Sequence, residues 1–456
     1  MRIHIALVDD CWDVLAESLK LDVESAFVAV LAIAMDEERT TVLVRELLPV
    51  PDDCYIERSR SHLLISSSGF MPGFGRAATA GAAVGFVHTH PGGRPAFSKL
   101  DDAVDGALAP VAFLRTGASL YVSLVAAGEA SQPRCEARVV DREGRAHTVE
   151  LVRAVGQRTD FFLRSGAGAA GDVDRFDRQI RAFGKDGQAL LGALRVGVVG
   201  AGGTGSAVCE QLARLGVGEI VVSDDDVVNA SNVSRIFGSG AADTGRLKVD
   251  VVADEVVRIG GETRVTTFGR KVTDAVVARA FRHCDFLFGC TDDQSGRAVL
   301  ARLAYWYLIP LLDVGVIVQS DSGRVTDVVG RVTYVGPGAP CLLCRKRIDP
   351  AVVAAEGLPA EERRRLASEG YVQGLGEPDP AVVGYTTLVA ATAVSEFLHS
   401  VIGLAPKVPG SEILLRIADR EVRVNEAQGR PGHYCMTRSG WGAGDVEPFL
   451  GMVWTA

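Results

Sequence analysis

The pattern of apolar and polar residues in the first third of the chain predicts a mixed α/β unit. Residues 27–34 and 41–49 are apolar runs with the length and composition of strands, and a charged turn at 36–39 joins them. A third apolar run, 85–90, is short and ends in two histidines. We therefore expect residues 1–160 to form one mixed α/β domain.

The later part of the chain alternates between strand-like and helix-like segments. Residues 194–200 are continuously apolar and bounded by glycine, as in a buried parallel strand, and 204–215 have helical spacing. Apolar runs at 218–223, 286–290 and 309–314 predict further strands. This alternation is typical of a Rossmann-like, doubly wound and mostly parallel sheet with helices on both faces.

A weakly patterned stretch separates the two regions. Residues 165–171 are rich in glycine and alanine, which indicates a linker. The expected organisation is a first domain at 1–160, a linker at 161–174 and a second domain at 175–456.

Composition narrows the classes of protein that fit. With 456 residues, 47 % hydrophobic and 23 % charged, the chain is long enough for two or three domains of a globular protein. The net charge of −9 and the absence of a basic run argue against nucleic acid as a partner. The apolar stretch 27–35 is too short to span a bilayer, and no basic segment leads into an apolar one, so we expect no membrane and no signal peptide. Nine cysteines without a disulfide-like pattern favour the reducing cytoplasm.

Two histidines and an aspartate have the spacing of a metal site. His88 and His90 are two residues apart at a strand end, so their side chains point the same way. Asp101 follows after a short loop and adds an oxygen ligand. Three protein ligands leave a fourth position for water, as in a catalytic zinc site, and a carboxylate is then needed to shuttle the proton. Glu24 is the expected carboxylate, with Glu17 as the alternative.

The full spacing H-x-H-x(7)-S-x-x-D, with Ser98 as its serine, resembles the JAMM (Mov34/MPN) metalloprotease family. Members of that family cleave isopeptide or peptide bonds next to the C-terminus of ubiquitin-like proteins. The resemblance implies that His88, His90 and Asp101 bind zinc. It also implies that Ser98 donates a hydrogen bond to the developing oxyanion and that Glu24 is the general base.

A glycine-rich loop follows the apolar run at 194–200 and precedes the predicted helix. Its glycines would let the backbone approach phosphate oxygens, and the helix N-terminus favours negative charge. The glycines of this loop are Gly200, Gly202, Gly203 and Gly205. Asp224, followed by Asp225 and Asp226, ends the next strand, where it can bind ribose hydroxyls. These features alone do not separate ATP from NAD or FAD.

Cations elsewhere in this region favour a triphosphate. Arg178, Arg235 and Lys248 would form a positive cluster, and Asp292, in a Cys-Thr-Asp element at a strand end, can hold magnesium. An oxidoreductase that transfers hydride needs no such cluster.

Residues 172–435 resemble the ThiF/MoeB/ubiquitin-activating superfamily. Five elements occur in the order of that family: R-F-x-R-Q-I, GxGGxGS, D-x-D-x-V-x-x-S-N-x-x-R, G-x-x-K and C-T-D. The resemblance implies ATP-dependent adenylation of a C-terminal glycine carboxylate on a ubiquitin-like or sulfur-carrier protein. It implies that Asp224 binds the ribose and that Asn232, Arg235 and Lys248 contact the phosphates, with Asp226 as a further nucleotide-binding residue. It also implies that Asp292 holds magnesium and that Arg178 is an arginine finger supplied by the partner of a homodimer.

The cysteines leave two questions open. Cys341 and Cys344 form a CxxC pair, and members of the family often have a second pair near the C-terminus. This chain instead offers His433 and Cys435, which would complete a structural zinc site of unusual spacing or leave a buried pair without metal. None of the isolated cysteines, including Cys290, is nominated as a thioester-forming nucleophile, because free cysteines are more often buried and inert.

Together, the two resemblances predict a bifunctional bacterial enzyme. Its first domain would cleave at the C-terminal glycine of a ubiquitin-like or sulfur-carrier protein, and its second domain would adenylate that carboxylate. One setting is protein conjugation, including antiviral conjugation systems, with a ubiquitin-conjugating-type partner. The other is sulfur delivery through a thiocarboxylate, with a sulfur donor. A nucleotide-dependent oxidoreductase and a non-catalytic scaffold for a ubiquitin-like tail are the remaining alternatives.

Overall fold

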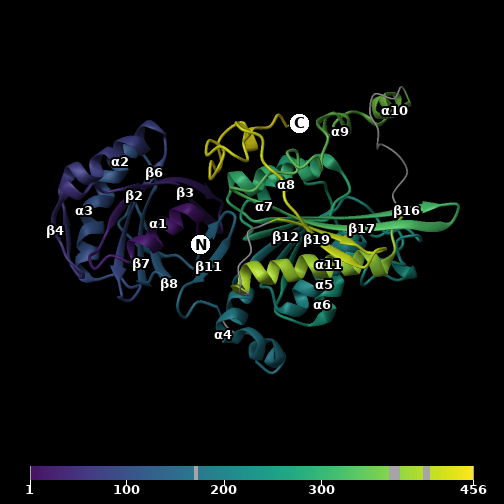
Figure 1. Cartoon of the computed structure of the whole chain (residues 1–456), viewed down its shortest axis with the longest axis horizontal. Helices are drawn as coiled ribbons and strands as arrows, with labels where there is room; N and C mark the ends of the chain where they lie inside the picture. Colours follow the sequence, from purple (N-terminus) through teal and green to yellow (C-terminus); the bar gives the residue numbers. More distant parts are fainter. Residues whose placement is uncertain (1, 169–172, 369–379, 404–410, 455–456) are drawn as a thin grey trace. The chain divides into compact units, whose positions relative to one another are not determined.

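The chain forms two compact units, described here from a computed structural model that covers residues 2–168, 173–368, 380–403 and 411–454 (Figure 1). The first unit comprises Met1–Ala167 together with Trp441–Phe449, and the second comprises Gly168–Gly440 with Leu450–Ala456. A strand, Thr159–Leu163, continues past the expected boundary at 160. Part of the expected linker, 169–172, lies outside the described residues.

The first unit contains a nine-stranded mixed sheet in the order β11-β10-β1-β3-β2-β6-β7-β8-β9. The expected strands at 27–34, 41–49 and 85–90 are confirmed as β2, β3 and β6. The strands are β1 (Arg2–Val8), β2 (Ala26–Met35), β3 (Arg39–Pro49), β6 (Ala83–Pro91), β7 (Leu120–Glu129), β8 (Gln132–Asp141), β9 (Ala146–Thr148), β10 (Leu151–Val155) and β11 (Thr159–Leu163). A small hairpin and three helices complete it: β4 (Tyr55–Arg58), β5 (Leu63–Ile65), α1 (Asp9–Ser18), α2 (Ser67–Thr79) and α3 (Lys99–Thr116).

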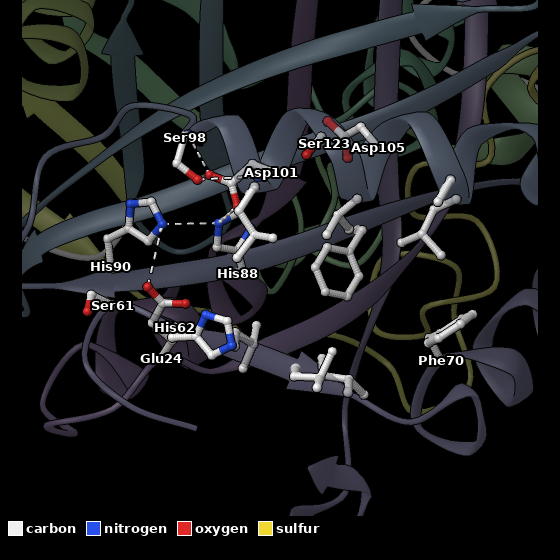
Figure 2. Close-up of a pocket in the computed structure, with 18 of the residues that line it drawn as sticks. Glu24, Ser61, His62, Phe70, His88, His90, Ser98, Asp101, Asp105 and Ser123 are labelled. Atoms are coloured by element: carbon white, nitrogen blue, oxygen red, sulfur yellow. Dashed lines mark hydrogen bonds and ion pairs between the residues drawn. The ribbon is translucent and has the colours of Figure 1, made fainter. Parts of the chain in front are cut away.

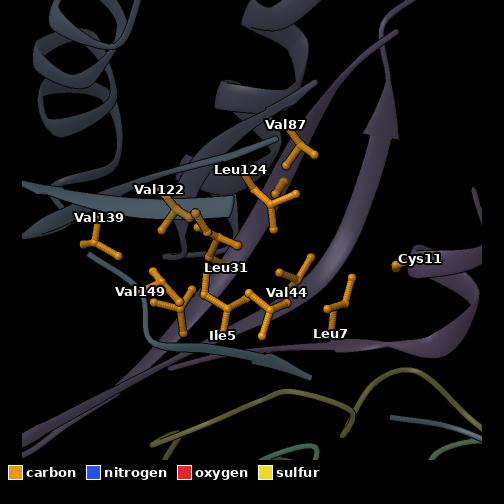
Figure 3. Close-up of a cluster of buried hydrophobic side chains, with 14 of the residues drawn as sticks. Ile5, Leu7, Cys11, Leu31, Val44, Val87, Val122, Leu124, Val139 and Val149 are labelled. Carbon is orange, nitrogen blue, oxygen red and sulfur yellow. The ribbon is translucent and has the colours of Figure 1, made fainter. Parts of the chain in front are cut away.

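Helices cover both faces of this sheet, which explains the unbroken apolar runs. In β2, Phe27, Ala29 and Leu31 belong to a core that includes Trp12 of α1 (Figure 3 shows part of this core). Their neighbours Ala26, Val28 and Val30 belong to a second core, built with residues of α2 and α3. Because successive strand residues point to opposite faces, a strand buried on both sides must be apolar throughout.

The second unit contains an eight-stranded sheet in the order β14-β13-β12-β15-β16-β17-β18-β19. Its strands are β12 (Arg195–Val199), β13 (Glu219–Ser223), β14 (Arg264–Phe268), β15 (Phe286–Gly289), β16 (Leu311–Asp321), β17 (Arg324–Val335), β18 (Glu412–Arg416) and β19 (Glu421–Asn425). Its helices are α4 (Asp177–Ala193), α5 (Gly203–Leu215), α6 (Lys248–Ile259), α7 (Ala275–Phe281), α8 (Gln294–Trp306), α9 (Pro350–Glu356), α10 (Ala360–Ser368) and α11 (Val383–Leu398).

Half of this sheet differs from the expected mostly parallel arrangement. The pairs from β14 through β16 are parallel, as predicted, but β16–β17, β17–β18 and β18–β19 are antiparallel. β16 runs seven residues beyond the expected end at 314 and turns back at Ser322 and Gly323. Both turn residues have positive φ, 50° and 79°. Such a two-residue turn matches the twist of a hairpin, so the antiparallel half begins here.

One segment, Val383–Gly403, is long and apolar enough to cross a membrane by length and composition. Its helix α11 packs against α5, β16 and β17. Val389, Ala390 and Phe397 on this helix are fully buried. Packing within the second unit therefore buries 39 % of the most apolar part of this segment.

The first unit should depend on its central strand. Leu31 on β2 is fully buried, so Leu31→Ala should destabilise this unit by about 2–5 kcal/mol through lost burial and a residual cavity. Hydrogen–deuterium exchange should accelerate in β2, β3 and β6 and stay unchanged in the second unit. Leu114→Ala is the matched control, because Leu114 is 85 % exposed. An equal effect of the two substitutions would contradict this account of the core.

Candidate functional sites

Three polar side chains of the first unit converge on one point. His88 and His90 lie at the end of β6, and their Nε2 atoms are 3.1 Å apart (Figure 2). Asp101, in the first turn of α3, places its Oδ1 3.1 Å from His88 Nε2. One ligand atom from each residue lies within 4.8 Å of the others. The sequence-predicted ligands are therefore brought together.

The serine of the motif fixes the aspartate. Ser98 is the N-cap of α3: its backbone N–H donates to Asp101 Oδ2 at 2.6 Å, and its hydroxyl accepts the Asp101 N–H at 3.2 Å. This reciprocal capping box holds the carboxylate and leaves Oδ1 facing His88. Contacts with His88 and Ser98 lower the pKa of Asp101, against the effect of its burial.

The expected base lies beside these residues. Glu24 lies two residues before the start of β2, and its Oε1 is 3.7 Å from His90 Nε2. Burial raises the pKa of Glu24 to about 7, while His88 lowers it and Asp101 raises it. The alternative, Glu17, is not among the residues that line the cavity at this site; it is exposed on α1, with its carboxylate 2.6 Å from Lys20 Nζ.

The donor set fits a metal ion with an open position. His90 Nδ1 lies 3.3 Å from the Arg94 carbonyl, so an Nδ1–H donated there leaves Nε2 free as a ligand. A cavity of about 460 Å³ opens beside the site. Glu24, Ser98 and the three convergent residues line it, together with apolar side chains such as Phe70 (Figure 2). Two imidazoles and one carboxylate facing a cavity suit zinc with a free coordination position.

In the second unit, two glycines make a tight loop between β12 and α5. Gly200 has φ +94°, and a Cβ there would lie 2.5 Å from the Cys290 carbonyl oxygen. A Cβ on Gly205 would lie only 1.8 Å from the Gly200 carbonyl oxygen. No larger residue fits either position without moving backbone. The tight turn therefore leads directly into the N-terminus of α5, the kind of helix end that can receive phosphate oxygens.

Asp224 connects this loop to the next one. Its Oδ2 accepts the Ala201 N–H at 2.7 Å and its Oδ1 accepts the Asp226 N–H at 2.9 Å. Lys248 Nζ lies 4.0 Å from Asp224 and 2.6 Å from Asp226. Burial raises the pKa of Asp224, and Lys248 opposes that shift. Two aspartates and a lysine thus meet at the carboxyl end of β13.

The remaining predicted residues of this site have different surroundings. The side-chain stem of Arg235 lies against Gly203, where a Cβ would be 3.2 Å from Arg235 Cδ. Asn232 is buried, and its Oδ1 accepts the Asn229 N–H at 3.2 Å. Asp292 is exposed just after β15, and Arg178 is exposed in the first turn of α4. The roles of Arg178 and Asp292 stay predictions.

The sequence did not single out Arg297, on α8. Its Nε donates to the Thr291 carbonyl at 3.2 Å, next to Asp292. In the sequence, Arg297 could have been noticed because it lies five residues after Asp292, the last residue of the Cys-Thr-Asp element.

Three cysteines and a histidine gather in the second unit. His433 Nδ1 lies 3.5, 3.6 and 3.2 Å from the Sγ atoms of Cys341, Cys344 and Cys435. Hydrogen bonding from Cys435 is the main cause that lowers the pKa of Cys341, to about 5. Three sulfurs and one nitrogen within 4.8 Å fit tetrahedral zinc. The H-x-C element therefore occupies the place of a second CxxC.

Three further cysteines of the second unit, Cys209, Cys284 and Cys290, are poor candidates for a nucleophile. All nine cysteines are free thiols. Burial raises the pKa of Cys209 to about 12 and that of Cys290 well above its ordinary value. Cys284 is fully buried. Thiols of this kind are poor nucleophiles.

A model of the ThiF family matches residues 176–432, more than half of the chain. The chain belongs to the ThiF family. The molybdopterin-synthase adenylyltransferase of Escherichia coli (strain K12) is 32 % identical to it over 178 residues, which cover 38 % of this chain and 68 % of that protein. The SAMP-activating enzyme E1 of Haloferax volcanii is 32 % identical over 177 residues, covering 38 % of this chain and 62 % of that protein.

The ThiF match has a clear extent. It includes the glycine loop, the Asp224–Lys248 cluster and the CxxC pair Cys341 and Cys344, and it ends just before His433 and Cys435. It begins at residue 176, so the histidine site of the first unit lies outside it. The adenylyltransferase names of the relatives therefore bear on the second unit only.

The cysteine–histidine cluster of this ThiF protein should hold one zinc ion. His433→Ala removes the nitrogen that contacts all three sulfurs, so about one equivalent of zinc should be lost and the second unit should melt at a lower temperature. Metal analysis by mass spectrometry and calorimetry would measure both. His147→Ala, at a histidine paired with Asp141 outside the cluster, should change neither. Unchanged zinc content in His433→Ala would contradict the assignment.

Proposed function

We propose that the second unit binds ATP and magnesium and adenylates the C-terminal carboxylate of a ubiquitin-like or sulfur-carrier protein that ends in glycine. The observation that carries this proposal is the cluster of Asp224, Asp226 and Lys248 beside the glycine loop, in a chain of the ThiF family. The relatives named as adenylyltransferase and as activating enzyme support the same reaction class.

Each residue then has a chemical task. The loop glycines and the N-terminus of α5 receive phosphate oxygens, and Asp224 with Asp226 binds the ribose. Lys248, Arg235 and Asn232 contact the phosphates as pyrophosphate leaves. Asp292 holds magnesium, which neutralises phosphate charge when bound. Arg178 acts as an arginine finger from the partner subunit of a homodimer.

For the first unit, we propose a JAMM-type zinc peptidase that acts at the same terminus. His88, His90 and Asp101 hold the ion, which supplies hydroxide near neutral pH when bound. Glu24 takes the proton from the attacking water and returns it to the leaving amine. The Ser98 hydroxyl accepts the Asp101 N–H, so its own proton remains to stabilise the oxyanion.

The biological setting has two candidates, both in the cytoplasm. The H. volcanii relative is named as an activating enzyme E1, which favours conjugation through a ubiquitin-conjugating-type partner, as in antiviral systems. The E. coli relative is named as a molybdopterin-synthase adenylyltransferase, which favours activation for sulfur transfer. A thioester product would indicate the first setting, and a thiocarboxylate the second.

Lys248→Ala should lower ATP–pyrophosphate exchange by about 100-fold, because one positioned cation on the phosphates is lost. The assay uses ubiquitin-like and sulfur-carrier proteins that end in glycine as candidate substrates. Lys185→Ala, at an exposed lysine of α4, should leave exchange unchanged. Absence of exchange with every glycine-ended candidate in the unaltered protein would remove the adenylation proposal.

His88→Ala should abolish cleavage of a precursor extended beyond its terminal glycine and should remove one zinc equivalent. Pyrophosphate exchange with the mature protein should persist, since the two sites share no residue. Mass spectrometry of the products would follow the cleavage, with His147→Ala as the control. Cleavage that survives in His88→Ala would show that this site is not the peptidase.

A further inference from the structure

Two arginines lie over a glycine in the antiparallel half of the second unit. Gly315 of β16 pairs with Arg331 of β17 in the sheet register. A Cβ on Gly315 would lie 3.3 Å from Arg331 Nη2 and 3.8 Å from Arg297 Nη2. Because glycine has no side chain, both guanidinium groups reach across the space above it. We call Arg297 and Arg331 the arginine pair.

The arginine pair carries more positive charge than its surroundings neutralise. Arg331 Nη2 is 2.5 Å from Asp313 Oδ2, and Arg297 Nε is 3.4 Å from Asp313 Oδ1, so one buried carboxylate serves both. Arg331 also interacts with Glu412, but that carboxylate is already paired with Arg347 at 2.5 Å. Three arginines thus share two carboxylates, which leaves one positive charge.

Hydrogen bonding is also incomplete. Arg331 Nε and Asp313 Oδ1 are buried and have no hydrogen-bond partner among the described residues. The charge and the unused donor of Arg331 would both be satisfied by one additional carboxylate. Carboxylates bind guanidinium groups through paired, charge-assisted hydrogen bonds.

The face of β16 that carries Gly315 becomes exposed further along the strand. Ile317, two residues on, points to the same face and is 54 % exposed. In the other direction, Arg297 Nε donates to the Thr291 carbonyl, next to the proposed magnesium ligand Asp292. A chain lying along this face would therefore end beside the proposed adenylation site.

We propose that the arginine pair over Gly315 binds a carboxylate of the protein tail that the second unit activates. The carboxylate is either the terminal one or an acidic side chain close to it. This inference rests on the proposed adenylation function and specifies the tail that the site accepts. It assigns Gly315, Arg297 and Arg331 to substrate recognition.

The test uses the whole protein without ATP and three fluorescent octapeptides ending in Gly-Gly. One has a free C-terminus as its only carboxylate, one is the same peptide as a C-terminal amide, and one is the amide with glutamate before the glycines. Anisotropy should show at least one of the two acidic peptides bound about tenfold more tightly than the neutral amide. Whichever acidic peptide binds identifies the source of the carboxylate.

Gly315→Val fills the space and keeps every charge, and valine is favoured in strands. It should remove the preference for the acidic peptide. Val257→Ala, at a valine of α6 that is 74 % exposed, should retain it. The double variant Asp313→Asn with Arg331→Gln should also lose the preference, without leaving a buried aspartate unpaired.

Three results would overturn the proposal: no binding of any peptide, equal binding of acidic and neutral peptides, or an acidic preference that survives in Gly315→Val. Pyrophosphate exchange is measured separately. If acidic peptides bind preferentially but the protein shows no exchange, the arginine pair remains a carboxylate site and the adenylation proposal is wrong. If exchange occurs but acidic peptides are not preferred, the adenylation proposal stands and the assignment of the arginine pair is wrong.

Discussion

The nucleotide-binding region proposed for the second unit depends on the half-buried carboxylate of Asp224. By accepting N–H groups from Ala201 and Asp226, it joins the loop after β12 to the loop after β13. Lys248 Nζ lies 4.0 Å from this carboxylate and 2.6 Å from that of Asp226, so the two aspartates together position its ammonium group. Without Asp224, the glycine loop would keep its tight backbone but lose its fixed relation to the residues proposed to bind ribose and phosphate. Binding residues are placed by the ends of neighbouring parallel strands, as in other doubly wound sheets.

In the first unit, ordinary helix capping has a comparable effect. Ser98 and Asp101 form a capping box, a common arrangement at the start of helices, at the N-terminus of α3. Here the capping aspartate also presents its second oxygen to His88. The side chain is therefore held in place by the helix it caps, before any metal binds. Such prior fixation lowers the entropy lost when ligands assemble around an ion.

The sequence predicted the parts that local patterns determine. Strands such as β2 and β12 are buried on both faces, so an unbroken apolar run identifies them. His88, His90 and Asp101 are close in sequence, and the structure brings them together. The antiparallel half escaped prediction, because β18 and β19 are five residues each and carry charged side chains. The meeting of Arg331 with Gly315 depends on strand register, which hydrophobic pattern alone does not fix at a particular pair.

The C-terminal segment has a consequence for how this chain can be divided. Trp441–Phe449 belongs to the first unit, and Gly444 there lies close enough to Leu43 and Ala32 that a Cβ would be 3.2 and 3.3 Å from them. The polypeptide therefore leaves the first unit, builds the second and returns. A cut at residue 167 would separate the first unit from part of its own packing. The first unit is therefore discontinuous in sequence, and a chain truncated after residue 167 would lack the segment Trp441–Phe449 that completes its fold.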